Sequence, residues 1–149
     1  MNRLPLAVVA LSLFLLAPPA FALGDAELEE DCATRAAREW AMLHPGSKNS
    51  ETTMFDAFPR TVTYAHHYSG RLNTCLYIET IDWNNSSTIA VTELTTDEHV
   101  HIPRGMFQAV SGKAPGACEV YPDLNTSPPL VRCRSKAEWQ ELMKPYLQD

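Results

Sequence analysis

The sequence predicts an α+β domain in which an antiparallel sheet of three to five strands, connected as a meander, is flanked by an N-terminal and a C-terminal helix. Three observations indicate this class. Apolar residues recur at helical spacing near each end of the chain, and runs of β-branched and aromatic residues lie between them. The chain also contains four cysteines, an even number that predicts two disulfides in an oxidising compartment.

Residues 1–22 have the pattern of a cleaved signal peptide. Arg3 supplies the positive start, an apolar run follows, and Ala20 and Ala22 stand where a signal peptidase reads small residues. The run is interrupted by Pro18-Pro19 and is shorter than the ~20 residues that a membrane-spanning helix needs. We therefore expect an exported protein, periplasmic or secreted, with residues 23–149 as one domain and no stable membrane insertion after cleavage.

A helix is predicted from Asp25 to about Leu43, because helix formers and acidic residues fill its first turns, where the macrodipole favours them. The apolar stripe of this helix consists of Cys32, Ala33, Ala36, Ala37 and Trp40. Glu39 falls outside that stripe. Pro45-Gly46 predicts the end of the helix, and residues 46–53 read as a polar loop.

Four strand-like runs follow at short spacing. Residues 60–68 and 74–83 are rich in β-branched and aromatic residues, and the second run has apolar side chains on both faces, as a central strand does. Residues 88–94 form a third run, and residues 99–102, before Pro103, predict an edge strand. Because the connections are short, an antiparallel meander is the simplest arrangement.

The C-terminal third is less regular until its last helix. Residues 105–110 fit either a short helical turn or a strand, residues 117–122 fit another strand, and residues 123–129 fit a loop. Ser135 and Glu138 then form a capping box for a final helix, whose last turn Pro145 is expected to distort or shorten. Its apolar residues are Trp139, Leu142, Met143, Tyr146 and Leu147. We expect both helices to pack on one face of the sheet.

Four cysteines allow three pairings, which the sequence alone does not separate. We prefer Cys32–Cys75, which ties the first helix to the central strand, with Cys118–Cys133, which closes a loop of moderate length. No C-x-x-C spacing is present, and this argues against a zinc ribbon or a thioredoxin-type redox pair.

Charge and motifs narrow the possible functions. Without residues 1–22 the chain has 11 basic and 18 acidic side chains, a balance of −7 that disfavours nucleic acid and anionic membranes but permits a basic or neutral partner. No nucleophile elbow, metalloprotease motif or phosphate-binding glycine loop occurs. Glu79 and Asp82 point to opposite faces of their strand, so we interpret them as surface charge rather than an acid–base pair.

A recognition surface is the remaining function class. Tyr64, Tyr68, Tyr77 and Trp83 are concentrated on two neighbouring strands, and such residues anchor protein interfaces, although they equally suit a core beneath the helices. The leading hypothesis is a non-enzymatic binding protein, such as an inhibitor, immunity factor or accessory factor, that acts on a protein or cell-envelope partner and needs no cofactor.

The alternative is a periplasmic protein that binds copper or zinc through histidines. The candidate ligands are His66, His67, His99 and His101. His99 and His101 alternate on one strand and so share a face, and imidazoles suit Cu²⁺ and Zn²⁺. Alternating Val100 and Ile102 also fit an ordinary half-buried strand with an outward polar face.

Overall fold

The fold is an antiparallel sheet with a helix on each side. The computed structural model describes residues 24–95, 101–111, 113–121 and 131–148, so the predicted signal peptide, His99 and the loop at 123–129 lie outside the described residues. The elements are α1 (Asp25–Leu43), β1 (Ser50–Phe55), β2 (Phe58–Ser69), β3 (Thr74–Trp83), β4 (Ser86–Leu94), β5 (His101–Val110), β6 (Ala117–Val120), β7 (Val131–Arg132) and α2 (Lys136–Leu147).

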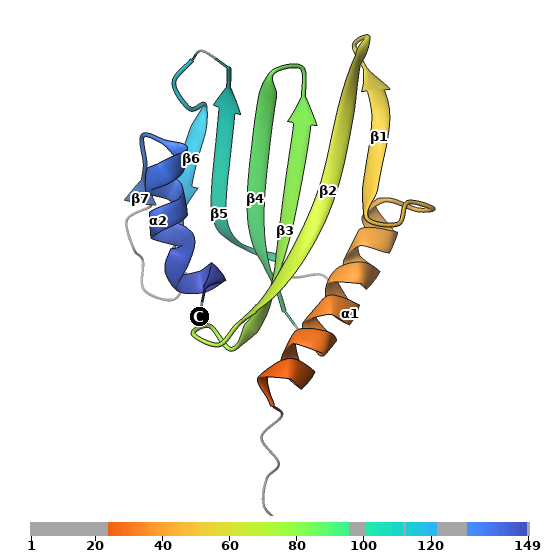
Figure 1. Ribbon diagram of the computed structural model, residues 1–149, viewed down its shortest axis with the longest axis vertical. Coiled ribbons are helices and arrows are strands. Elements are labelled where there is room, and N and C mark those ends of the chain that lie inside the picture. The colour runs from red at the N-terminus through yellow and green to blue at the C-terminus, as the bar shows by residue number, and fades with distance from the viewer. Residues whose placement is uncertain (1–23, 96–100, 112, 122–130, 149) are drawn as a thin grey trace, which may run out of the picture.

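The seven strands of the described chain form one sheet in sequence order, β1 to β7, and each neighbouring pair is antiparallel (Figure 1). The predicted α+β class and the antiparallel meander are therefore confirmed. The predicted number of three to five strands is too low. The strand with the strongest pattern, β3, has the predicted bounds and hydrogen-bonds to a neighbour on each side.

Two strand predictions need correction. Residues 50–53, expected to lie in a polar loop, belong to β1 (Ser50–Phe55), whose side chains are mostly exposed and so carry no apolar alternation. The run at 99–102 was expected to be a separate edge strand. Its described part instead begins β5, which continues past Pro103 to Val110 and lies between β4 and β6. The register shifts opposite Val91 and Thr92, and such an irregularity accommodates a proline within a strand.

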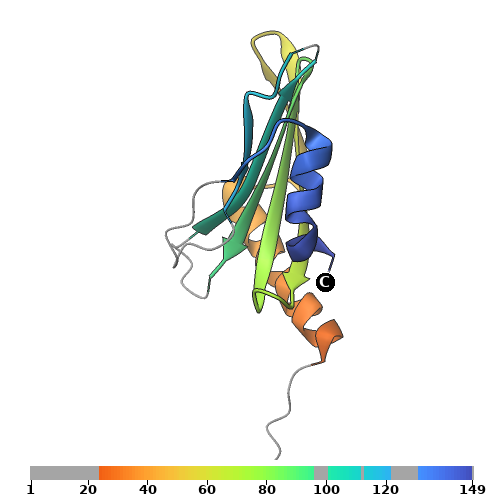
Figure 2. The same ribbon diagram turned by 90° about the vertical axis from the view of Figure 1, so that its left-hand side faces the viewer.

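The two helices cover opposite faces of the sheet, whereas we expected them on the same face. Side chains alternate along β3, so Cys75 and Tyr77 pack under α1 while Leu76 packs under α2. Seen along the sheet in Figure 2, the helices lie on its two sides. The physical reason is that both faces of β3 are apolar, and each face must be shielded from water.

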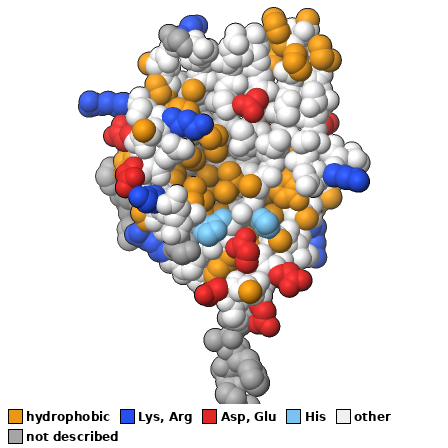
Figure 3. All heavy atoms as spheres, in the orientation of Figure 1, with side chains coloured by type: hydrophobic (Ala, Val, Ile, Leu, Met, Phe, Trp, Pro, Cys, Tyr) orange, Lys and Arg blue, Asp and Glu red, His pale blue; other side chains and the backbone are white. Residues whose placement is uncertain are grey.

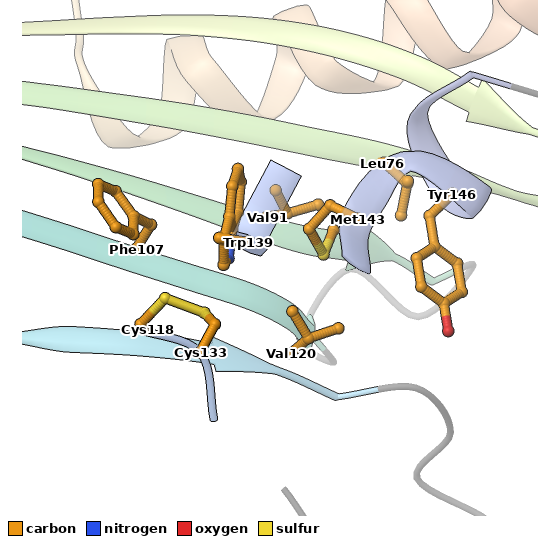
Figure 4. Packing of buried hydrophobic residues seen from close by; sticks show 9 residues of the cluster. All are labelled: Leu76, Val91, Phe107, Cys118, Val120, Cys133, Trp139, Met143 and Tyr146. Atoms are coloured by element: carbon orange, nitrogen blue, oxygen red, sulfur yellow. A yellow bond between two sulfur atoms is a disulfide. The ribbon is translucent and has the colours of Figure 1, made fainter. Parts of the chain in front are cut away.

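The core beneath α2 joins the helix to the last strands (Figure 4). Its buried members are Leu76, Val91, Phe107, Cys118, Val120, Cys133, Trp139, Met143 and Tyr146. Trp139 donates its indole Nε1–H to the carbonyl of Glu119 at 3.3 Å, and a Cβ added to Gly105 would lie 2.7 Å from the Met143 sulfur. The Ser135 hydroxyl accepts from the Glu138 amide at 3.2 Å, which is the predicted cap. Pro145 does not shorten this helix, which ends at Leu147.

The opposite core holds α1 against β2 and β3. Cys32 is bonded to Cys75, and Cys118 to Cys133, which is the preferred pairing. Arg35 donates to the carbonyls of Leu94 and Thr95, the latter at 2.9 Å. Disulfides of this kind persist in oxidising compartments. Neither described helix is long and apolar enough to span a membrane.

Candidate functional site

Four rings form a stack on the α1 side of the sheet. The imidazole of His44, the residue that follows α1, lies 3.9 Å from the Trp40 ring, centroid to centroid. Trp40 lies 5.0 Å from Tyr64, and Tyr64 lies 5.7 Å from Tyr77. The stack therefore runs from the end of α1 across β2 to β3, and it fixes the position of the helix end over the sheet.

Carboxylates from three elements surround this stack. A Glu51 oxygen on β1 lies 2.5 Å from His44 Nδ1, and a Glu79 oxygen on β3 lies 3.7 Å from His44 Nε2. Glu39 on α1 is only 8% exposed, although it was predicted to fall outside the buried stripe. Glu39 lies seven residues after Cys32 and three after Ala36, so the helical repeat places it on the edge of the face that packs against the sheet.

A pocket of about 310 Å³ lies beside α1, on the same face of the sheet. Its lining residues are Glu39, Leu43, Tyr77, Glu79, Ala90 and Thr92. The strand register places Tyr77 opposite Thr92 and Glu79 opposite Ala90, so the side chains from β3 and β4 point to the same face. Two acidic residues and one tyrosine therefore line one concave surface.

The Tyr77 hydroxyl is buried at this pocket without a hydrogen-bond partner, and it is the one such side-chain oxygen or nitrogen in the part of the chain that the structure describes. Tyr77 as a whole is 5% exposed. Its burial, followed by the nearby charges of Glu79 and Glu39, raises the pKa of the phenol well above its usual range. The group therefore stays protonated at neutral pH, with a proton to donate and lone pairs to accept.

A second feature of the molecule is the apolar end of the β1–β2 hairpin, which we call the hairpin end: Met54, Phe55, Phe58 and Trp83. The side chains of Met54, Phe55 and Phe58 are 69%, 53% and 45% exposed. Figure 3 shows the hydrophobic side chains gathered at this tip of the molecule. Trp83 on β3 supports them, because its indole donates to the Phe55 carbonyl at 3.3 Å and its ring meets the Phe55 ring edge-on at 5.4 Å.

The turn that closes the hairpin is a tight two-residue connection. Asp56 and Ala57 both have positive φ, 49° and 65°, as a type I′ turn requires. Beneath the hairpin end lies a hollow of about 190 Å³. Its lining residues are Phe55, Arg60, Ile81, Trp83, Ser86, Thr88 and Gln108.

The aromatic residues that the sequence singled out divide between core and surface. Tyr64, Tyr68 and Tyr77 belong to the cluster under α1, and the Tyr68 hydroxyl donates to Asn73 Oδ1 at 2.5 Å. Trp83 lies apart from them at the hairpin end. The structure thus brings three tyrosines together beneath a helix, and only Trp83 beside exposed apolar side chains.

Of the histidines proposed as metal ligands, the structure describes His66, His67 and His101, and the sheet does not bring these three together. His66 and His67 are consecutive on β2 and so point to opposite faces. The backbone of His101 pairs with Leu94 on β4, and two strands separate β5 from β2, a lateral distance of about 14 Å. Within the described residues, no group of three or more histidine, cysteine or acidic side chains is arranged to hold a metal ion.

The sequence did not single out Glu39, His44 or the members of the hairpin end other than Trp83. The spacing of Tyr77 and Glu79 already placed these two on one face of a strand. Glu39, which lines the same pocket from α1, is about forty positions away in the chain. The run from Met54 to Phe58 held a usable signal, since apolar residues flank a two-residue turn. Comparison with known proteins gave no matching family model, no similar curated protein and no similar solved structure.

Proposed function

We propose that this chain is a non-catalytic binding protein that docks onto a protein partner through the hairpin end. The observation behind this proposal is that three of the six large hydrophobic side chains exposed in the described part of the chain lie within five residues, at one tip of the molecule. Clustered apolar surface at one place is the usual mark of an interaction site, whereas scattered exposed residues are not.

The hairpin end is also held in place before any partner arrives. Arg60 pairs with Trp83 across β2 and β3, and the Trp83 indole donates to the chain at Phe55. A surface that is already ordered loses little conformational entropy on docking. Aromatic residues with a hollow beside them are typical anchors of protein interfaces.

The edge of the sheet favours a protein as the partner over a lipid surface. Among the described elements β1 pairs with β2 alone, so its other side presents backbone donors and acceptors. The β1 sequence, SETTMF, contains neither the lysine nor the proline that commonly blocks strand addition. A partner strand can add to such an edge, and the acidic chain is repelled by anionic membranes. Inhibitor, immunity and accessory roles are all forms of this function.

Site-specific photo-crosslinking in the source organism tests the proposal. A benzophenone amino acid is placed at Phe55, and the matched control carries it at Gln140, an exposed position on α2. We expect a discrete protein adduct from position 55 that is absent from position 140 and disappears when Phe58 is changed to Ser. Adducts of the same masses from both positions, or none from position 55, would count against docking through the hairpin end.

A further inference from the structure

We propose that the pocket beside α1, lined by Glu39, Tyr77 and Glu79, is a binding site for a protonated primary amine. This inference does not depend on the hairpin end, which shares no residue with the pocket. The ammonium group has two possible sources, a lysine side chain of a bound protein or a free small amine. Both present the same three N–H donors to the pocket.

The number and kind of acceptors favour an ammonium ion. An ammonium donates three hydrogen bonds and accepts none. The pocket presents two carboxylates and one phenol oxygen, from α1 and from β3. All three residues line the same pocket, and both carboxylates are near enough to contribute to the raised pKa of the Tyr77 phenol. A cation placed there is attracted by both negative charges, in addition to the contact that Glu79 makes with His44.

The buried hydroxyl is the independent sign of a ligand. Buried polar groups almost always have a partner, and leaving one without a partner costs free energy. The Tyr77 hydroxyl has none, in a wall of the pocket, while Tyr64 on the neighbouring strand stacks against its ring and holds it in place. A ligand N–H that reaches the phenol oxygen would satisfy it.

The mouth of the pocket explains how a ligand enters. Leu43, the last residue of α1, is 54% exposed and is the most exposed member of the lining. The Tyr77 hydroxyl itself is closed to water. Leu43 is therefore the lining side chain with the most freedom to change rotamer, whereas the end of the helix is fixed by Trp40, which is buried and stacked on both sides.

A divalent metal ion fits this pocket less well than an ammonium ion. Calcium takes six to eight oxygen ligands and magnesium requires a near-octahedral set. The described residues provide no cluster of three or more metal-ligating side chains here. The aromatic and apolar walls instead suit the carbon chain that carries an amine.

The test uses the oxidised protein, with calorimetry and backbone amide NMR at a fixed 0.15 M ionic strength. The probe is n-butylammonium, and the matched neutral probe is 1-butanol. We expect saturable binding of the ammonium in the millimolar range, with shifts at Tyr77 and Glu79, and no such shifts with butanol. Glu79→Gln and Tyr77→Phe should each weaken binding, by about tenfold for the lost charged hydrogen bond. Glu141→Gln, which removes an exposed carboxylate on α2, should leave binding unchanged.

A titration with a lysine analogue identifies the source of the amine. N-acetyl-lysine-methylamide binding as tightly as butylammonium or tighter supports a lysine side chain of a partner, and clearly weaker binding supports a free small amine. Equal losses in Glu79→Gln and Glu141→Gln would show diffuse attraction to an acidic protein and overturn the proposal. Calcium that displaces the ammonium at lower concentration, or the absence of binding by either amine, would overturn it too.

Discussion

At the scale of single residues, the Tyr77 hydroxyl lowers the free energy of unfolding of the ligand-free protein. Its hydroxyl is buried without a partner, and such a group costs about 1–3 kcal/mol relative to one that is satisfied. Tyr77→Phe removes the hydroxyl and keeps the stacked ring. We therefore predict that this variant raises the free energy of unfolding, by about 1 kcal/mol, in urea denaturation at pH 7. A clear loss of stability would mean that the hydroxyl has a partner in solution.

Urea denaturation of the same two proteins at alkaline pH supplies a control. The pKa of Tyr77 is higher in the folded protein than in the unfolded chain, so ionisation of the phenol favours unfolding. This ionisation leaves the free energy of unfolding unchanged below pH 10 and lowers it as the pH rises beyond that value. We expect the native protein to lose stability above pH 10 more steeply than Tyr77→Phe does. Parallel curves for the two proteins would contradict the burial of the phenol.

Residue identities alone could not have placed Glu39 in the site. On a helical wheel it lies beside the apolar stripe, and a glutamate there is normally a solvated charge. Its burial follows from how α1 docks, with Trp40 stacked on Tyr64. That stack joins residues 24 positions apart, a tertiary contact that local periodicity does not encode.

At the scale of elements, the success of the sequence-based predictions depended on burial. β3 was predicted with the observed bounds because both its faces are apolar and its ends are turns. β1 was missed because it is an exposed edge strand, and an exposed strand has no need for alternating hydrophobic residues. The two apolar faces of β3 also implied cover on both sides, which the expectation of two helices on one face overlooked.

The two disulfides should contribute unequally to stability. Cys32–Cys75 closes a loop of 43 residues and Cys118–Cys133 one of 15. In the chain-entropy model the longer loop is worth about 4 kcal/mol and the shorter about 3 kcal/mol. We predict that replacing Cys32 and Cys75 by Ala lowers the free energy of unfolding by roughly 1 kcal/mol more than replacing the other pair. Urea titrations of both double variants measure this difference, and the reverse order would show that native-state effects dominate.

At the scale of the whole molecule, the sheet is wider than either helix covers. α1 shields β2 and β3 on one face, and α2 shields the later strands on the other. The hairpin end lies beyond both helices (Figure 1). The α+β class and the pair of disulfides were predictable, because they follow from local pattern and cysteine count. The pocket was not, because it needs side chains from α1, β3 and β4 together.

The affinity for the crosslinked partner, once identified, tests the docking surface most directly. Calorimetry would compare the native protein, a Phe55→Ser/Phe58→Ser variant and a Met42→Ser variant. Met42 is a matched control because it is 52% exposed but lies on α1. We predict at least a tenfold loss of affinity for the double variant, as expected for removing interface anchors, and no change for Met42→Ser. Equal affinities for all three proteins would contradict it.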